Sequence, residues 1–245
     1  MVIKSVVLAG TAVHTRDLDQ DYDWYIKAGS LHLFEQINEI YGIALRNVDD
    51  EVPKLAVIIE GQRIGFLIGN MPCQRLDHAK QMIRDTLYLE FDTQHQQNVL
   101  HAAAMLLLCP KNHYSDYEQH FIDYAEILFY NSSHTANLIL KTVKLPVVSQ
   151  QPNFTLEPLK ESKVALLSDE NNKNRCARYL IHSIHKEDKI SFVFLSTGQL
   201  KLQKCQQIAD KHDECIILTL SQEVTTEKAN LKRSKLFNMK NLLKL

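Results

Sequence analysis

Apolar and β-branched positions are patterned most clearly between residues 54 and 92. Residues 55–60 and 63–68 are two apolar runs rich in β-branched side chains, and only Gly61 and Gln62 separate them. A two-residue gap with glycine first is typical of a tight hairpin with a type II′ turn. We therefore expect these runs to pair as antiparallel strands.

The next segment changes to a helical pattern. Residues 69–72 read as a breaker, and Leu76, Ala79 and Ile83 then recur at i, i+3 and i+7 within residues 75–84. This spacing predicts a short helix with one buried face. Residues 86–91 are again continuously apolar and predict a buried strand.

The chain before this unit predicts a strand, a loop and a helix. Residues 2–9 read as the strand. Residues 15–23 carry four aspartates but lack the central glycine and terminal glutamate of a calcium loop, so an acidic surface loop is expected. Ser30 precedes apolar residues at helical spacing and is expected to cap a helix that ends at Gly42.

Two helices are expected after residue 92. Thr93 with Gln96 makes a capping box ahead of an apolar segment that Pro110 closes. Ser115 with Glu118 makes a second capping box. The second helix carries an aromatic stripe that suits either a ligand groove or the core and an interface: Tyr114, Tyr117, Phe121, Tyr124 and Leu128.

The last third alternates between strand and helix patterns. Three prolines in residues 145–160 indicate a linker. Strands are then expected at 164–168, 190–196 and 215–220, with helices at 171–185 and 200–212, which is the βαβαβ unit of a Rossmann-like parallel sheet. The expected fold class is α/β, mixed α+β, with domains at 1–144 and 161–222 and a basic amphipathic tail at 223–245.

Composition argues against several classes of protein: strongly basic nucleic-acid binders, disulfide-rich proteins and membrane-spanning proteins. With 245 residues, 45% of them hydrophobic, the chain can bury a substantial core, and a net charge of −1 argues against a strongly basic nucleic-acid binder. Its five cysteines form no CxxC pair, so neither a disulfide framework nor a zinc knuckle is expected, and a reducing cytoplasm is the natural compartment. No apolar run is long enough to predict a membrane span.

Familiar catalytic signatures are absent from the sequence. It contains no HExxH, GxSxG, Walker or GxGxxG motif, so enzymatic activity stays uncertain, with a non-catalytic role preferred, and no cofactor is indicated. His182 and His185 have i, i+3 spacing but lack a suitably spaced third ligand, so no metal site is predicted.

Ligand candidates follow from the expected parallel sheet, because ligands bind beyond the carboxyl ends of parallel strands. Loops there offer hydroxyls and helix N-terminal amides to a phosphate, although ordinary helix capping explains the same residue types. The candidates are Ser168, Asn171, Ser196, Thr197 and Gly198.

Charged candidates for partner binding fall into three groups, each of which also suits a solvated surface. The central unit contributes Arg75, Asp77 and Arg84. A basic stripe contributes Arg175, Arg178, His182 and His185, and the tail contributes Lys232, Arg233 and Lys235. The tail suits a groove on a protein partner better than a membrane, and disorder is its other interpretation.

One pattern in the central unit resembles a known group of proteins. Pro72, then Arg75-Leu76-Asp77, then Arg84-Asp85-Thr86-Leu87 resembles accessory proteins of GTPase- and ATPase-linked bacterial anti-phage systems. The resemblance implies a regulatory, non-catalytic subunit with protein partners. The sequence leaves two alternatives open: a nucleotide or small-molecule sensor, and a hydrolase or nuclease using Asp77, His78 and Asp85.

Overall fold

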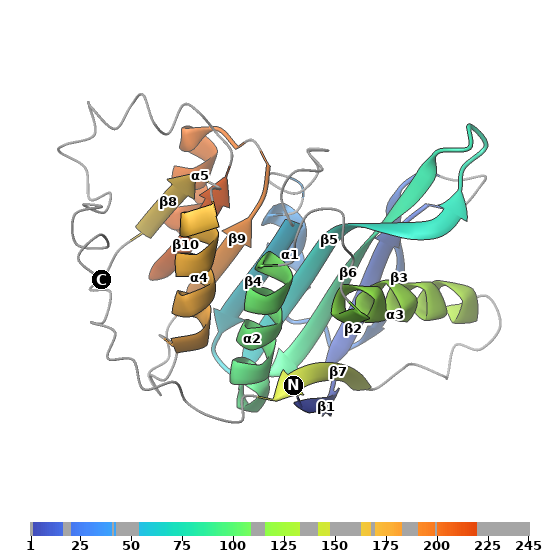
Figure 1. Cartoon of the computed structure of the whole chain (residues 1–245), viewed down its shortest axis with the longest axis horizontal. Coiled ribbons are helices and arrows are strands. Elements are labelled where there is room, and N and C mark those ends of the chain that lie inside the picture. Colours follow the sequence, from blue (N-terminus) through green and yellow to red (C-terminus); the bar gives the residue numbers. More distant parts are fainter. Residues whose placement is uncertain are drawn as a thin grey trace.

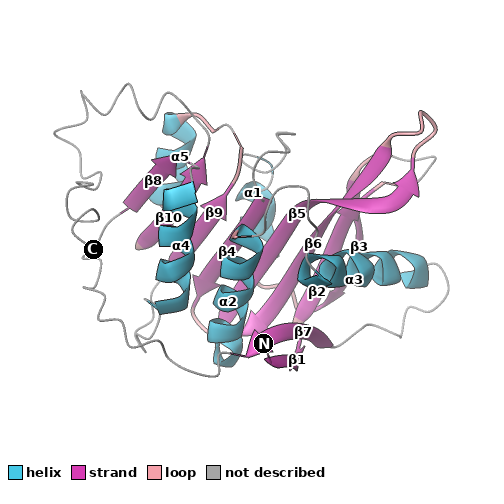
Figure 2. Ribbon diagram, in the orientation of Figure 1, coloured by secondary structure: helices cyan, strands magenta, loops and turns pink. Residues whose placement is uncertain are grey.

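Strands and helices alternate around one large sheet in the computed structural model (Figures 1 and 2). The structure describes residues 2–16, 21–40, 42, 54–108, 116–132, 142–147, 163–167, 170–182, 191–198 and 200–219. Eight strands form a mixed sheet in the order β3-β2-β6-β5-β4-β9-β10-β8, and β1 and β7 form a separate pair. The predicted α/β class is confirmed.

The predicted hairpin forms the centre of the sheet. Strands β4 (Lys54–Glu60) and β5 (Arg63–Leu76) are antiparallel, with Glu60 opposite Arg63. Gly61 has φ 58° whereas Gln62 has no positive φ, as a type II′ turn requires. Strand β6 (Met82–Asp92) then pairs with β5 and contains the strand expected at residues 86–91.

The first residues also form strands. The expected first strand is β1 (Val2–Val7), which pairs with β7 (Thr142–Val147), so the predicted linker 145–160 begins inside a strand. Strands β2 (Gly10–Thr15) and β3 (Asp23–Gly29) lie at the edge of the large sheet. The expected acidic loop therefore starts and ends on strand residues, and residues 17–20 lie outside the described part of the chain.

The βαβαβ prediction for the last third is confirmed. The elements are β8 (Lys163–Leu167), α4 (Glu170–His182), β9 (Phe192–Ser196), α5 (Leu202–Ala209) and β10 (Glu214–Thr219). All three strands are parallel, and β10 lies between β9 and β8. Strand β9 also pairs antiparallel with β4, so one sheet runs through both predicted domains.

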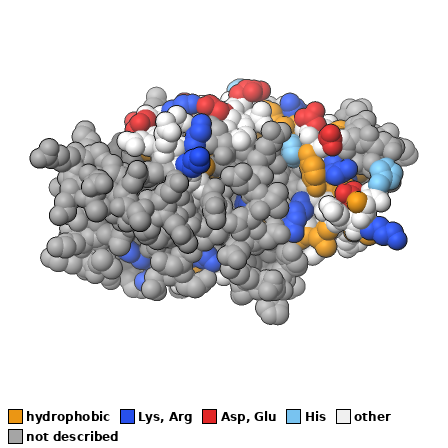
Figure 3. All heavy atoms as spheres, turned by 90° about the horizontal axis from the view of Figure 1, so that it is seen from above, with side chains coloured by type: hydrophobic (Ala, Val, Ile, Leu, Met, Phe, Trp, Pro, Cys, Tyr) orange, Lys and Arg blue, Asp and Glu red, His pale blue; other side chains and the backbone are white. Residues whose placement is uncertain are grey.

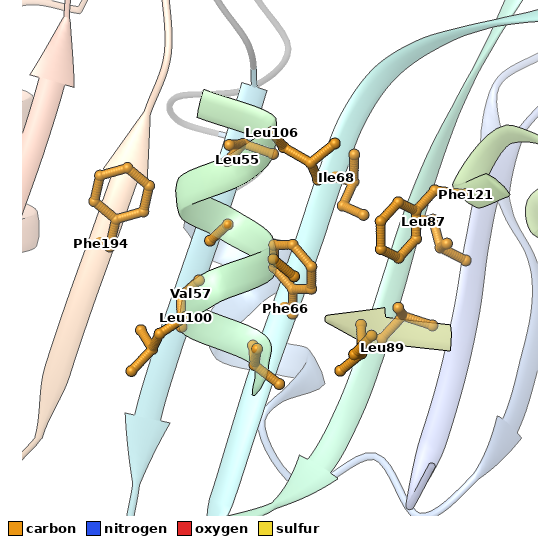
Figure 4. Close-up of a cluster of buried hydrophobic side chains, with 14 of the residues drawn as sticks. Leu55, Val57, Phe66, Ile68, Leu87, Leu89, Leu100, Leu106, Phe121 and Phe194 are labelled. Atoms are coloured by element: carbon orange, nitrogen blue, oxygen red, sulfur yellow. The ribbon is translucent and has the colours of Figure 1, made fainter. Parts of the chain in front are cut away.

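Helices cover both faces of the sheet. One face packs against α2 (Gln96–Leu107), α3 (Asp116–Ser132) and α4, and the other against α1 (Phe34–Ile40) and α5. Figure 4 shows the first face, where α2 lies over β4 and β5. Phe121 of the aromatic stripe is 0% exposed and meets Phe66 edge-on, so the described part of the stripe belongs to the core.

The N-termini of α2 and α1 are not capped by the side chains that the sequence predicts. Thr93 begins a short 3₁₀ helix (Thr93–His95), its hydroxyl bonds to Gln62, and α2 has no side-chain cap. At α1, the buried Glu90 carboxylate accepts hydrogen bonds from the backbone N–H groups of His32 (2.9 Å) and Leu33 (3.1 Å). Glu90 therefore replaces the cap expected from Ser30, which bonds to His32 instead.

The helix predicted at residues 75–84 is wrong. Residues 63–76 and 82–92 are strands of one long hairpin, and residues 77–81 form its turn. Of the three residues on the predicted buried face, only Ile83 is buried, while Ala79 is exposed and Leu76 is 51% exposed. Pairing with β6 supplies the backbone hydrogen bonds that a helix would have supplied. This tertiary pairing therefore outweighs the helical spacing of the apolar residues.

Within the described ranges, no helix combines the length and the apolar character needed to cross a membrane.

Three partly buried histidines give the fold a pH dependence. Burial lowers the pKa of His101, whose Nδ1 has no hydrogen-bond partner among the described residues, and burial also lowers the pKa of His95 and His120. The unfolded chain therefore takes up protons first, below about pH 6.5, and the free energy of unfolding falls as the pH drops through this range. Urea unfolding from pH 7.5 to 5 should show this fall, and His101→Gln should reduce its slope. An unchanged slope in His101→Gln would contradict this assignment.

Candidate functional site

The hairpin of β5 and β6 extends beyond the sheet as an arm, defined here as residues 71–85 (Figure 1). Pairing of β4 with β5 ends at Lys54 and Gly69, and pairing of β2 with β6 ends at Thr86. A bulge lies at this boundary, between Ile68 and Met71, and Asn70 within it has φ 63°. Bulges bend and twist a hairpin, which directs the arm away from the sheet.

Asp77 closes the turn of the arm. Its Oδ1 accepts a hydrogen bond from the backbone N–H of Gln81 at 2.8 Å, and its carbonyl accepts one from Lys80 at 2.9 Å. Its Oδ2 lies 3.4 Å from the Arg16 guanidinium. The predicted interaction residue Asp77 therefore shapes the tip and ties it to the end of β2.

Arg75 connects the arm to the body of the protein. Its guanidinium donates to Asp85 Oδ1 and Thr15 Oγ1, each at 2.7 Å, and to the Arg16 carbonyl at 2.8 Å. Its Nε lies 3.4 Å from Glu126 of α3. The planar fork thus binds four oxygens from three separate elements, a geometry that lysine does not reproduce.

The Arg75 side chain and its carboxylate partners are largely shielded from water. Its side chain is 12% exposed, and those of Asp85 and Glu126 are 1% and 14% exposed. The guanidinium also lies 3.8 Å from the centre of the Phe129 ring, so α3 contributes an aromatic face as well as a carboxylate.

Only one of the two carboxylate oxygens of Asp85 accepts a hydrogen bond from the described residues. Its Oδ1 accepts hydrogen bonds from Thr15 at 2.5 Å and from Arg75, but its buried Oδ2 has no partner among the described residues. Burial raises the pKa of Asp85 above its usual range, although Thr15 and Arg75 act in the opposite direction. Burial tends to lower the pKa of Arg75, but the nearby Asp85, Cys73 and Glu126 together raise it.

Cys73 completes the cluster. It is 4% exposed, and its Sγ, one Asp85 oxygen and one Glu126 oxygen all lie within 4.8 Å of one another. Burial and the neighbouring Asp85 raise the pKa of this thiol to about 12. We call Cys73, Arg75, Asp85 and Glu126 the arm-base cluster.

Sequence reasoning found part of this cluster. It selected the members Arg75 and Asp85 together with the neighbouring Asp77, although on a helix. It missed the members Cys73 and Glu126, and also Thr15, which bonds to the cluster. Thr15 and Glu126 lie 70 and 41 positions from Asp85 in the chain, and no spacing rule links them. Arg84, a further candidate, lies at the arm base, where its Nη1 is 3.3 Å from the Asn70 carbonyl.

The predicted phosphate loop is closed. Ser196 and Thr197 are both 0% exposed, and the Thr197 N–H donates to the Leu218 carbonyl at 2.9 Å. The Thr219 hydroxyl donates to the Gly198 carbonyl at 2.6 Å and accepts from the Leu200 N–H at 3.1 Å. The Thr219 side chain thus holds the loop against the carboxyl end of β10, while the buried Ser196 Oγ has no partner among the described residues.

The remaining candidates are only partly visible. Arg175 is partly buried and Arg178 is exposed on α4, as expected of a stripe at the edge of a helix face. The rest fall on residues, or on side chains, outside the described part of the chain: Ser168, Asn171, His182, His185, Lys232, Arg233 and Lys235.

Comparisons with protein-family models, with curated proteins and with solved structures give no match.

The arm-base cluster predicts a large effect of one substitution. Arg75→Met leaves the Asp85 carboxylate buried without its charged partner, so the free energy of unfolding should fall by roughly 3 kcal/mol. Arg63→Met is the matched control, because Arg63 and Asp92 form an exposed pair on the same two strands and should contribute less than about 1 kcal/mol. Urea unfolding of both variants measures the difference, and equal losses would contradict a special role for Arg75.

Proposed function

We propose that this protein is a non-catalytic accessory subunit that binds a protein partner through the arm. The observation that carries the proposal is an exposed apolar pair near the tip. Leu76 and Met82 are 51% and 53% exposed and directly opposite each other in the strand register, so their side chains share one face. In Figure 3, hydrophobic side chains lie among charged ones at the right-hand end of the molecule, the side of the arm in Figure 1.

The anchoring of the arm supports this proposal. Arg75 joins both arm strands to β2 and α3 through hydrogen bonds and ion pairs, and the Asp77 turn is tied to Arg16. An arm fixed before binding loses little conformational freedom when a partner engages it. The exposed pair is therefore presented in a defined place, as a binding surface requires.

A hydrolytic role finds less support in the geometry. Asp85 is 1% exposed and bonded to Arg75 and Thr15, and Asp77 is engaged in the turn and with Arg16. Carboxylates held in this way are poorly placed to activate water at a substrate.

The sensor alternative keeps one observation in its favour. Ser196 Oγ is buried at the carboxyl end of β9, where parallel sheets bind ligands, and it has no partner among the described residues. If this is a nucleotide site, a thermal-shift screen against nucleotides should raise the unfolding temperature, and Ser196→Ala should remove the rise. The accessory-subunit proposal expects no shift.

The cellular setting is part of the same proposal. The four cysteines that lie in the described part of the chain, Cys73, Cys176, Cys205 and Cys215, are free and buried, as suits a reducing cytoplasm. The resemblance of residues 54–92 to accessory proteins of anti-phage systems suggests a multiprotein defence complex. Loss of phage resistance on deletion of the gene, in a host that carries the complex, tests this part.

Charged substitutions on the arm should weaken partner binding. Burying a leucine or methionine side chain contributes about 1.5–3 kcal/mol, so Leu76→Glu with Met82→Glu should weaken an interface built on this pair by at least about tenfold. Tagged full-length protein isolated from its own cells should lose a partner that the unmodified protein retains, as measured by quantitative mass spectrometry.

The control for this experiment is Leu108→Glu. Leu108 is 42% exposed but lies at the end of α2 rather than on the arm, so this variant should keep the partner. Equal recovery of every associated protein with both arm and control variants would contradict the proposal. Turnover of a substrate that Asp77→Ala abolishes would favour the enzyme alternative instead.

A further inference from the structure

The arm-base cluster is one positive charge short. Two carboxylates, Asp85 and Glu126, face a single guanidinium, and the neighbouring Arg16–Asp77 pair is neutral by itself. The unsatisfied atom is identified: Asp85 Oδ2 is buried and has no hydrogen-bond partner in the described structure. A buried carboxylate oxygen without a donor is costly, so the site favours an additional positive charge.

We infer that the arm-base cluster binds a zinc ion through Cys73 Sγ, Asp85 Oδ2 and a carboxylate oxygen of Glu126. These three side chains offer donor atoms within 4.8 Å of one another. Ligand atoms around tetrahedral zinc lie about 3.5 Å apart, so side-chain movements of about 1 Å close the site. A water molecule then fills the fourth position.

The donor set favours zinc over magnesium or calcium. A thiolate is a soft ligand that selects metals such as zinc, whereas Mg²⁺ and Ca²⁺ prefer oxygen ligands only. Binding releases the Cys73 proton to solvent, and the resulting thiolate, two carboxylates and one guanidinium carry two negative charges in all, which Zn²⁺ neutralises.

Arg75 fits this site as an outer partner of the ligands. It bonds to Asp85 through Oδ1, which leaves Oδ2 free for the metal, and its Nε faces Glu126 Oε1. Hydrogen bonds of this kind fix ligating carboxylates and are common around metal sites. Thr15 adds a second bond to Asp85 Oδ1 and holds the same orientation.

The position of the site gives the metal a structural effect. Cys73 lies on β5, Asp85 on β6 and Glu126 on α3, so one ion links both strands of the arm to the helix beneath it. Zinc binding should therefore stiffen the arm and raise the unfolding temperature of the whole chain. This inference rests on the cluster alone and does not require the proposed function.

Metal binding to the full-length protein tests the inference directly. Protein freed of metal with a chelator should bind one equivalent of Zn²⁺ in a calorimetric titration, and Co²⁺ in its place should give a thiolate-to-cobalt charge-transfer band. Cys73→Ser should abolish that band and lower the Zn²⁺ affinity by at least about tenfold, whereas Cys205→Ser, which changes another buried cysteine, should retain both.

A second variant keeps the test decisive if Cys73→Ser fails to fold. Glu126→Gln alters the least buried ligand and should weaken Zn²⁺ binding by a similar factor without loss of the fold. Absence of Zn²⁺ binding at micromolar concentration in the unmodified protein would overturn the inference and leave a proton as the extra charge. Binding that neither Cys73→Ser nor Glu126→Gln affects would overturn it equally.

Discussion

Strand β4 joins the two halves of this protein, and the rest of the sheet depends on its burial. It hydrogen-bonds to β5 on one edge and to β9 on the other, and residues 54–59 are all buried. Its alternate side chains enter two different cores, with Val57 facing α2 and Ile58 facing the side of α1 and α5. Neither half could complete its core without this strand, because a sheet face is stable only when another layer covers it.

The arm follows from the point at which this sheet ends. Once β4 and β2 stop pairing, the hairpin of β5 and β6 continues without the neighbours that hold the rest of the sheet. A two-stranded ribbon is marginally stable by itself. Arg75 compensates by binding residues of β2, β6 and α3 together, so ionic contacts add to the few buried apolar side chains at the base of the arm. Structure and proposed function meet here, because the same contacts that stabilise the arm also hold its apolar tip in a fixed position.

The unsatisfied charge at the arm base also has a structural origin. Glu126 comes from α3, whose aromatic face packs into the core through Phe121, so packing of the helix fixes where this carboxylate lies. Cys73 and Asp85 are placed by the strand ladder of the arm. The side chains of Cys73, Asp85 and Glu126 thus lie together because the packing of α3 and the strand pairing of the arm place them there. No local sequence motif brings them together.

The sequence by itself determined the elements whose signals are local. The hairpin at Gly61 and the βαβαβ order of the last third follow from turn chemistry and from continuous apolar runs, which act over a few residues. Only the tertiary structure decided that residues 75–84 belong to the arm and not to a helix, because strand pairing supplies hydrogen bonds that local spacing cannot reveal. The same holds for the cap that Glu90 provides to α1 and for the meeting of Thr15, Cys73, Asp85 and Glu126, since contacts between distant residues exist only after the chain has folded.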